Sequence, residues 1–236
     1  MSVDVNELDA DTLTATISAS TQNHVLVGAH VLLPTGSSLG SVNAFMSIAS
    51  TSVECRAHIN SARSIFTRHN SGTGQNNDTT FDLAFDTWTS ILMLMGPFDG
   101  GSTGTNIGYA DGSKNADNDA TANISENFTQ IKIGGDHEIG TNTSAWPAQI
   151  AEVFVFNNIT EANADTIASE ATTTLPDAFS IEPDHYWPFL SNGTATLGGN
   201  NMTSGGSPTY DAGEHPSLSG GGGGGTPSPI VVIVDS

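Results

Sequence analysis

The sequence predicts an all-β protein, an antiparallel β-sandwich with one short helix near residues 160–171. Short segments rich in Val, Ile, Phe and Thr recur along the chain, and Gly, Asn, Ser and Thr separate them, which is typical of strands joined by turns. Only one segment has the length and capping of a helix, so alternating β and α units are not indicated. The 236 residues suffice for one large sandwich or two small domains.

The first hundred residues contain six expected strands: 24–33, 42–49, 54–60, 62–69, 81–86 and 88–95. The third and fourth of these strands can pair around Asn60-Ser61. In the fifth strand, Phe81, Leu83 and Phe85 alternate with polar or small residues and are predicted to share one face. The sixth, WTSILMLM, is almost continuously apolar, which predicts a central strand covered on both faces.

The segment WPAQIAEVFVFNNITEANADTIAS combines a strand and a helix start. Residues 150–156 are predicted to form a strand, and Asn157-Asn158 a turn. Thr160 is placed to cap the following helix, with Ile159 packing on Ala164 as a hydrophobic staple. The helix must end before Pro176.

These segments together resemble a known family. The Trp-led strand 88–95, the hairpin IGYADGS (107–113), the strand FTQIKIGG (128–135) and the final strand with its short helix follow the order found in laminin G-like domains of the concanavalin A-like superfamily. The resemblance spans roughly Val25 to Ala171 and implies a concanavalin A-like jelly roll. The family often has glycine before its last strand, where this chain has Pro147-Ala148. Such folds include enzymes, lectins and structural proteins, so the resemblance implies a fold rather than an activity.

We expect four regions along the chain. Residues 1–22 are an acidic N-terminal arm, and residues 23–175 are the laminin G-like sandwich. Residues 176–218 are an acidic appendage with extra strands, one of them near the aromatic HYWPFLSN (185–192). Residues 219–236 are a glycine-rich tether followed by a β-strand.

The charge of the chain excludes several partners. Its 25 acidic and 5 basic residues give a formal charge of −20, which argues against binding nucleic acid or anionic membranes. A solvated acidic surface or a cationic partner fits better. The N-terminus lacks the features of a secretory signal, and no apolar run is long enough to span a membrane, so we expect neither secretion through a signal peptide nor membrane insertion. The single cysteine, Cys55, allows no internal disulfide and is expected to be a buried thiol.

The sequence lacks the carboxylate pattern of glycosidases, and its match to a nucleophile elbow, Gly36-Ser37-Ser38-Leu39-Gly40, is expected to be a loop. Glycosidases of this fold use carboxylates spaced along one strand, and no such string occurs here. Asp82 and Asp86 share a predicted strand face, but they would lie ~13 Å apart, beyond the ~9.5 Å limit of an inverting pair. We therefore expect a protein that is not an enzyme, with a hydrolase built from several strands as the lesser alternative.

One loop resembles a cation site. Oxygen-bearing side chains occupy alternate positions, as in a calcium loop: Asp111, Ser113, Asn115, Asp117 and Asp119. The three aspartates are the candidate ligands, although Ala116 stands where glycine is usual. Calcium is the single cofactor considered, and a solvated hairpin loop is the alternative.

Two further sets of residues suggest partners. Sugar sites favour exposed aromatic rings beside polar groups, and Tyr109, Trp146 and Trp187 are the candidates for glycan binding, with core packing as the alternative for each. Three of the five basic residues, Arg56, Arg63 and Arg68, fall close together and could meet an acidic surface on a neighbouring copy. Internal ion pairs are the alternative.

The C-terminal strand is the other candidate interaction segment. Five β-branched residues follow the glycine tether: Ile230, Val231, Val232, Ile233 and Val234. A free strand of this kind promotes aggregation, so we expect it to join a sheet edge, either that of its own chain or that of a neighbour.

From these features we expect a structural protein of a virus particle. The specific prediction is a bacteriophage capsid decoration or tail-appendage protein, made in the host cytoplasm, that assembles through its termini with copies of itself and other particle proteins. A carbohydrate-binding module or adhesin that recognises surface glycans is the alternative.

Overall fold

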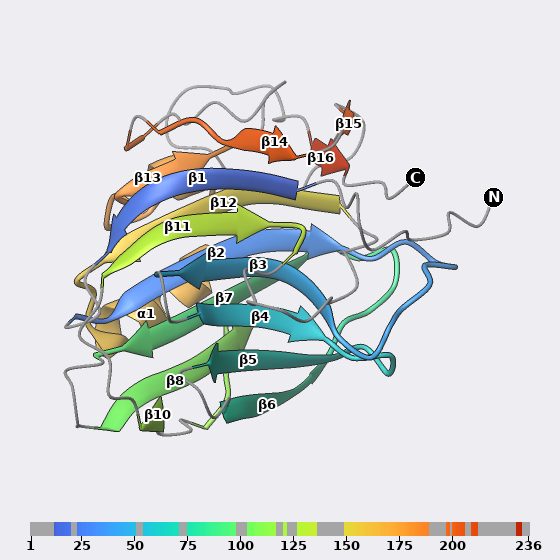
Figure 1. The fold of residues 1–236 in the computed structure, drawn as a ribbon, viewed down its shortest axis with the longest axis horizontal. Helices are drawn as coiled ribbons and strands as arrows, with labels where there is room; N and C mark the ends of the chain where they lie inside the picture. The colour runs from blue at the N-terminus through green and yellow to red at the C-terminus, as the bar shows by residue number, and fades with distance from the viewer. Residues whose placement is uncertain are drawn as a thin grey trace.

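The structure is a computed structural model that describes residues 12–19, 23–50, 54–70, 75–97, 103–116, 120–121, 127–135, 149–188, 197–198, 200–205, 209–211 and 230–232. Two antiparallel sheets are stacked face to face, and one helix covers the outer side of one of them (Figure 1). The predicted antiparallel sandwich with a single short helix is therefore confirmed.

The first sheet has seven strands. In spatial order they are β14 (Thr203–Gly205), β1 (Thr12–Ala19), β11 (Phe128–Ile133), β3 (Asn43–Ala49), β4 (Glu54–Ile59), β5 (Ser64–Asn70) and β6 (Gln75–Asp82). β4 and β5 form the predicted hairpin around Asn60, with Ile59 opposite Ile65.

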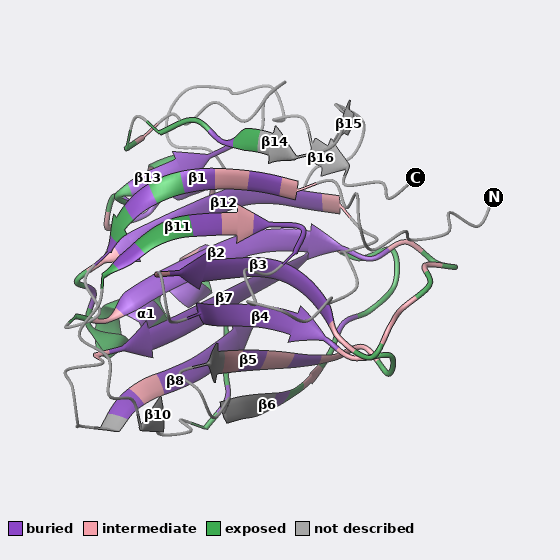
Figure 2. Cartoon of the chain, in the orientation of Figure 1, coloured by how far each residue is buried: buried purple, intermediate pink, exposed green. Residues whose placement is uncertain are grey.

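The second sheet has nine strands. Its main path is β10 (Ala120–Thr121), β8 (Thr103–Ala110), β7 (Thr89–Gly96), β2 (Val25–Leu32), β12 (Gln149–Asn157), β16 (Ile230–Val232) and β15 (Thr209–Asp211), while β13 (His185–Trp187) pairs with β12 and β9 (Ser113–Lys114) with β8. Every residue of β2 and β7 is buried, as Figure 2 shows, so the apolar run beginning at Trp88 is indeed a central strand covered on both faces.

The helix α1 (Glu161–Glu170) packs on the outer side of the second sheet. The Thr160 hydroxyl accepts a hydrogen bond from the Asn163 N–H (3.2 Å) and caps the helix as predicted. Ile159 and Ala164 are buried in the same apolar cluster, together with Phe154 of β12 and Phe179, which follows the 3₁₀ helix η1 (Pro176–Ala178). One hydrophobic core thus lies between the sheets, and a second lies beneath α1.

The N-terminal arm predicted for residues 1–22 is partly a strand of the sandwich. Within β1, Leu13, Ala15 and Ile17 are buried in the core between the sheets, and the intervening residues point outward. β1 lies between β14 and β11. Apolar and polar residues alternate along TLTATISA, which is the pattern of a strand with one buried face. The acidic residues that precede this segment favour the interpretation of the whole region as a solvated arm.

The strand predicted at residues 81–86 ends early. β6 ends at Asp82, and Leu83 is buried as expected, but Phe85 is 37% exposed. Asp86 has a left-handed backbone, with φ of 52°, because the chain turns there toward β7. Phe85 therefore leaves the apolar face that alternation assigned to it.

The C-terminal strand joins a sheet of its own chain. Ile230 to Val232 form β16, which pairs with Gln149 and Ile150 of β12 and with β15. Of the two destinations considered for this segment, the described part of the chain shows the intramolecular one.

Three connections meet at one end of the sandwich, on the right in Figure 1. They are the β2–β3 connection (33–42), the β4–β5 turn (60–63) and the β6–β7 connection (83–88). Backbone hydrogen bonds join them, from the Leu83 N–H to the Arg63 carbonyl (3.0 Å) and from the Asp86 N–H to the Leu33 carbonyl (2.9 Å). This end is therefore a single interlinked surface.

Candidate functional site: an aromatic rim

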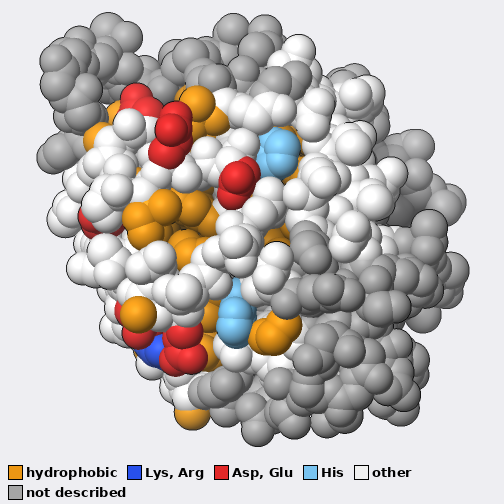
Figure 3. All heavy atoms as spheres, turned by 90° about the vertical axis from the view of Figure 1, so that its left-hand side faces the viewer, with side chains coloured by type: hydrophobic (Ala, Val, Ile, Leu, Met, Phe, Trp, Pro, Cys, Tyr) orange, Lys and Arg blue, Asp and Glu red, His pale blue; other side chains and the backbone are white. Residues whose placement is uncertain are grey.

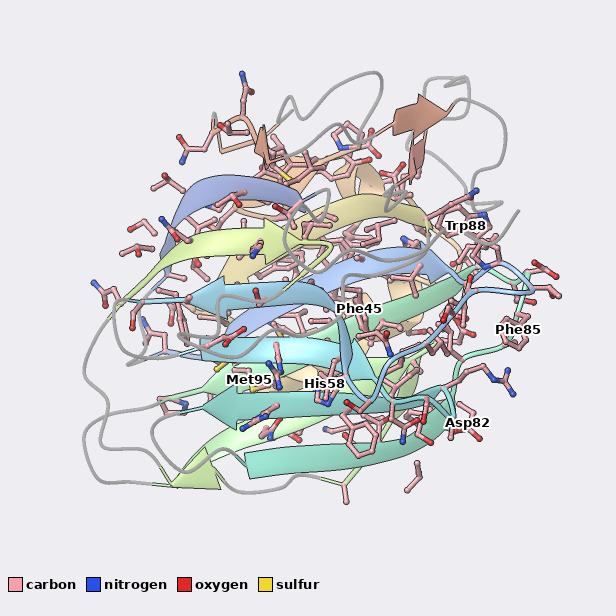
Figure 4. All side chains as sticks on the ribbon, turned by 45° about the vertical axis from the view of Figure 1, so that its right-hand side comes forward. Phe45, His58, Asp82, Phe85, Trp88 and Met95 are labelled. Carbon is pink, nitrogen blue, oxygen red and sulfur yellow. The ribbon has the colours of Figure 1, made fainter. Side chains whose placement is uncertain are left out.

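The candidate site lies on these three connections, and we call it the aromatic rim. It comprises Thr35, Arg63, Asp82, Phe85, Asp86 and Trp88. Figure 4 shows Phe85, Trp88 and Asp82 at the same end of the sandwich, while Phe45 and Met95 lie in the core between the sheets. The rim thus combines aromatic rings with charged groups at the surface.

Phe85 is the exposed hydrophobic side chain of the rim. Its 37% exposure is the highest among the large hydrophobic residues in the described part of the chain. The Arg63 guanidinium carbon lies 4.6 Å from the centre of its ring. A cation at this distance interacts favourably with the ring and orients both groups.

Arg63 occupies the last position of the β4–β5 turn. Its N–H donates to the Asn60 carbonyl (2.9 Å), and the Asn60 side chain accepts hydrogen bonds from the N–H groups of Ala62 and Ser64. Arg63 Nη1 donates to the Leu83 carbonyl at 2.7 Å. Within the described part of the structure the guanidinium contacts this carbonyl and the Phe85 ring, and no carboxylate. Most of its N–H donors are therefore available to a ligand.

Asp86 is held by Thr35. One of its carboxylate oxygens accepts the Thr35 N–H (2.8 Å), and the other accepts the Thr35 hydroxyl (2.5 Å). The hydroxyl and N–H of Thr35 lower the pKa of Asp86, because hydrogen bonds to a carboxylate favour its ionised form. Asp86 therefore contributes a fixed negative charge to the rim.

Asp82 and Trp88 each have one polar side-chain atom without a hydrogen-bond partner in the described part of the chain. Asp82 Oδ1 accepts the Ser64 hydroxyl (2.9 Å), and its other oxygen has no protein partner in the described part of the chain. Trp88 is partly buried, and its indole N–H has no hydrogen-bond partner there. The rim therefore offers an acceptor at the surface in Asp82, whereas the Trp88 indole nitrogen is buried and does not reach solvent.

The backbone near the rim is strained. Among the described residues, six other than glycine have positive φ, and Arg63 (71°), Thr80 (59°) and Asp86 (52°) lie at or next to the rim. The left-handed conformation costs about 1–2 kcal/mol for residues with a side chain. Strain of this kind is often found at ligand-binding positions, where surrounding hydrogen bonds maintain it.

The aromatic residues chosen from the sequence are placed elsewhere. Tyr109 is 1% exposed, with its hydroxyl donating to Asp165 (2.9 Å), and Trp187 is fully buried, with its indole N–H donating to the Asn200 carbonyl (2.7 Å). Neither ring faces solvent, so core packing, the stated alternative, describes both. Trp146 lies outside the described residues.

The predicted cationic cluster is divided. Arg56 and Arg68 face each other across β4 and β5, and Lys132 continues the same row through Ser47 on the outer face of the seven-stranded sheet. Arg56 is 2% exposed, and both arginines make interactions within the chain. Arg63 alone of the three arginines reaches the rim.

The proposed calcium loop is only partly described. Asp111 accepts the Ser90 N–H through Oδ1 (2.9 Å), and burial raises the pKa of its carboxyl group. Asp117, Asp119, Ile233 and Val234 lie outside the described residues. Across the residues that are described, no group of three His, Cys, Asp or Glu side chains is arranged to hold a metal ion. In the same part of the chain, no helix has the length and apolar character required to cross a membrane.

Several solved structures share this architecture. A protein from Bacteroides ovatus proposed to bind carbohydrate is 15% identical, with a TM-score of 0.54 over 84% of this chain and 59% of its own. The heptameric SAP-like pentraxin of Limulus polyphemus is 12% identical, with a TM-score of 0.47 over 71% of this chain and 85% of its own. Domains LG4-5 of the mouse laminin alpha1 chain are 12% identical, with a TM-score of 0.49 over 63% of this chain and 40% of that chain.

No protein-family model matches the sequence, and no curated protein is significantly similar to it. At these identities the structural likeness concerns the fold alone. The fold is an antiparallel β-sandwich of the concanavalin A-like type, as the sequence resemblance implied.

Local sequence patterns do not reveal the rim. Alternation places Phe85 on an apolar strand face, and the apolar run places Trp88 at the start of a central strand. The available signal was Asp86-Thr87 directly after Phe85, since polar residues that favour turns indicate that a strand has ended.

Proposed function

We propose that this protein is a non-catalytic carbohydrate-binding module that binds saccharides at the aromatic rim. The observation that carries the proposal is Phe85, an exposed ring fixed by the Arg63 guanidinium and flanked by Asp82 and Asp86. Small-ligand sites combine an apolar surface with a few oriented polar groups. A pyranose has an apolar face that can pack on the Phe85 ring, and hydroxyl groups that can form hydrogen bonds with the charged side chains of the rim.

The architecture of the rim supports binding without large rearrangement. Hydrogen bonds link the three connections, and the carboxylate of Asp86 is held at both oxygens by Thr35. A preorganised site loses less conformational entropy on binding. The similar fold of the Bacteroides ovatus protein proposed to bind carbohydrate is consistent with this function by analogy.

The test is a comparison of Phe85→Ala and Phe85→Tyr. A glycan array with the unaltered protein selects a ligand, and titration calorimetry then measures its affinity for each variant. We expect Phe85→Ala to weaken binding at least tenfold, roughly 1.4 kcal/mol, and Phe85→Tyr to retain binding because the ring is preserved. Thermal unfolding is the control, and an exposed side chain predicts a small change in Tm.

Two results would contradict the proposal: an array without any bound glycan, or a bound glycan whose affinity is unaffected by Phe85→Ala. The alternative function, a structural protein of a virus particle that assembles through its termini, has weaker support. Its main argument was the C-terminal strand, and β16 pairs within its own chain. Neither the comparisons nor the described residues provide an observation specific to a virus particle.

A further inference from the structure

The charges at the aromatic rim restrict the kind of saccharide that it could accept. Among the described residues of the rim, the charged side chains are one guanidinium, Arg63, and two carboxylates, Asp82 and Asp86. Asp86 stays ionised because Thr35 lowers the pKa of its carboxyl group. The rim therefore has a negative balance, on a chain whose formal charge is −20.

The rim offers both hydrogen-bond donors and an acceptor. One Arg63 N–H is used by the Leu83 carbonyl (2.7 Å), which leaves others pointing away from that contact. Asp82, next to Leu83 in the chain, has one oxygen engaged by Ser64 at 2.9 Å and the other without a partner in the described part of the structure. Adjacent hydroxyl groups of a sugar can accept from a guanidinium and donate to a carboxylate at the same time.

An acidic sugar suits the rim less well. A ligand carboxylate or sulfate could pair with Arg63, but it would lie beside two carboxylates and approach a strongly negative molecule. Like charges in such a site cost several kcal/mol. An uncharged sugar uses the same donors and acceptor without that repulsion and without the desolvation of a ligand charge.

Resting on the proposed carbohydrate-binding function, we infer that the rim selects uncharged saccharides with adjacent hydroxyl groups and discriminates against uronic, sialylated and sulfated ones. Arg63 and Asp82 bind the hydroxyl pair, and Phe85 packs against the apolar face of the ring. Asp82 and Asp86 together supply the discrimination against anions.

The experiment uses two pairs of related probes, and in each pair one member is uncharged and the other carries carboxylate groups. Lactose is compared with 3′-sialyllactose, and fully methyl-esterified oligogalacturonide with the free acid, by titration calorimetry on the full chain at low and high salt. In at least one pair we expect the uncharged member to bind tenfold or more tightly, with an affinity that hardly changes with salt. The acidic member should bind better as salt increases, because salt screens repulsion.

Asp82→Asn is the diagnostic variant, and Glu182→Gln is its matched control. Glu182 is exposed and precedes β13, near the end of β12 that lies opposite the rim. Figure 3 faces this opposite end of the sandwich. The substitution therefore removes one charge from the molecule without touching the rim. We expect Asp82→Asn to reduce the preference for the uncharged probe at least threefold and Glu182→Gln to leave it unchanged.

The outcomes separate the two proposals. An acidic probe that binds equally or more tightly, with affinity lost in Phe85→Ala, overturns the charge selectivity and leaves carbohydrate binding intact. An equal change of preference in Asp82→Asn and Glu182→Gln assigns the selectivity to overall charge and overturns the role of Asp82. If neither these probes nor the array glycans bind, carbohydrate binding itself is wrong.

Discussion

At the scale of the residue, Arg63 combines a structural cost with exposed hydrogen-bonding capacity. Its φ of 71° is one that glycine or asparagine adopts more easily. The side chain nevertheless spans from the turn to the Leu83 carbonyl and the Phe85 ring. A residue placed against its backbone preference, with unused donors at the surface, is more readily explained by binding than by stability.

Substituting Arg63 tests that explanation. Arg63→Asn relieves roughly 1 kcal/mol of backbone strain and loses about 1–2 kcal/mol of hydrogen bonding and cation–π interaction. The free energy of unfolding should therefore change by less than about 1 kcal/mol, while saccharide affinity falls tenfold or more. Urea denaturation measures the first quantity, and calorimetry the second.

Arg63→Lys is the control that keeps the charge. Lysine lacks the planar fork of arginine, so we expect its binding to lie between those of the unaltered protein and Arg63→Asn. Equal affinity in all three proteins would contradict a role for Arg63 in binding.

At the scale of the element, β16 shows how a predicted strand finds its partner. Its Val and Ile residues indicate a strand from the sequence alone. Composition does not indicate which sheet edge the strand pairs with. The structure pairs Val231 with Ile150 of β12 and with Tyr210 of β15. A two-sided pairing of this kind satisfies backbone groups that would otherwise be exposed at the edge of β12.

Ending the chain at Leu218 removes β16 and exposes that edge. We expect Tm to fall by about 2–4 °C, the shift that corresponds to about 1 kcal/mol in a chain of this size, with a greater tendency to aggregate. At low concentration the oligomeric state, measured as mass in solution, should be the same as that of the full chain, because the lost pairing is intramolecular. A stable oligomer that forms with the full chain alone would show instead that the strand pairs between copies.

At the scale of the whole molecule, the buried hydroxyl of Tyr186 and the buried thiol of Cys55 are expected to make the stability of the fold decrease at alkaline pH. Tyr186 is 3% exposed and donates a hydrogen bond to Glu152, which is fully buried. Burial and the negative charges of Glu152 and Asp177 raise the pKa of Tyr186 well above its ordinary value of 10.0. Burial, with a smaller contribution from Glu54, raises the pKa of the Cys55 thiol above 9.0.

Both groups keep their protons in the folded state at a pH where the unfolded chain releases them. Their contribution to stability is complete below the unfolded pKa and is lost as pH rises above it. The free energy of unfolding should therefore decrease above pH 9 for Cys55 and above pH 10 for Tyr186, by up to about 1.4 kcal/mol per pH unit for each group.

Urea denaturation between pH 8 and 11 measures this dependence. Cys55→Ala should remove the loss that begins near pH 9 and leave above pH 10 the loss due to Tyr186, with a slope about half that of the unaltered protein. Stability that stays constant to pH 11 would indicate that neither proton is retained by folding.

The fold class and most of the central strands could be predicted from the sequence alone, whereas β1 and the end of β6 could not. Alternation placed the sandwich strands, the unbroken apolar run after Trp88 identified a strand buried on both faces, and Thr160 marked the start of the helix. These features depend on residues only a few positions apart, so the spacing of apolar and polar residues along the chain is sufficient to predict them.

The tertiary structure alone decided which aromatic residue reaches the surface. Tyr109, Trp187 and Phe85 look alike in the sequence, yet the first two are buried and the third is exposed. That difference depends on where β6 ends and on contacts such as that between Thr35 and Asp86, which are 51 residues apart. Contacts between residues so far apart in the sequence form only when the chain folds and brings separate connections together. The local sequence pattern around one connection does not specify which other connection it will meet.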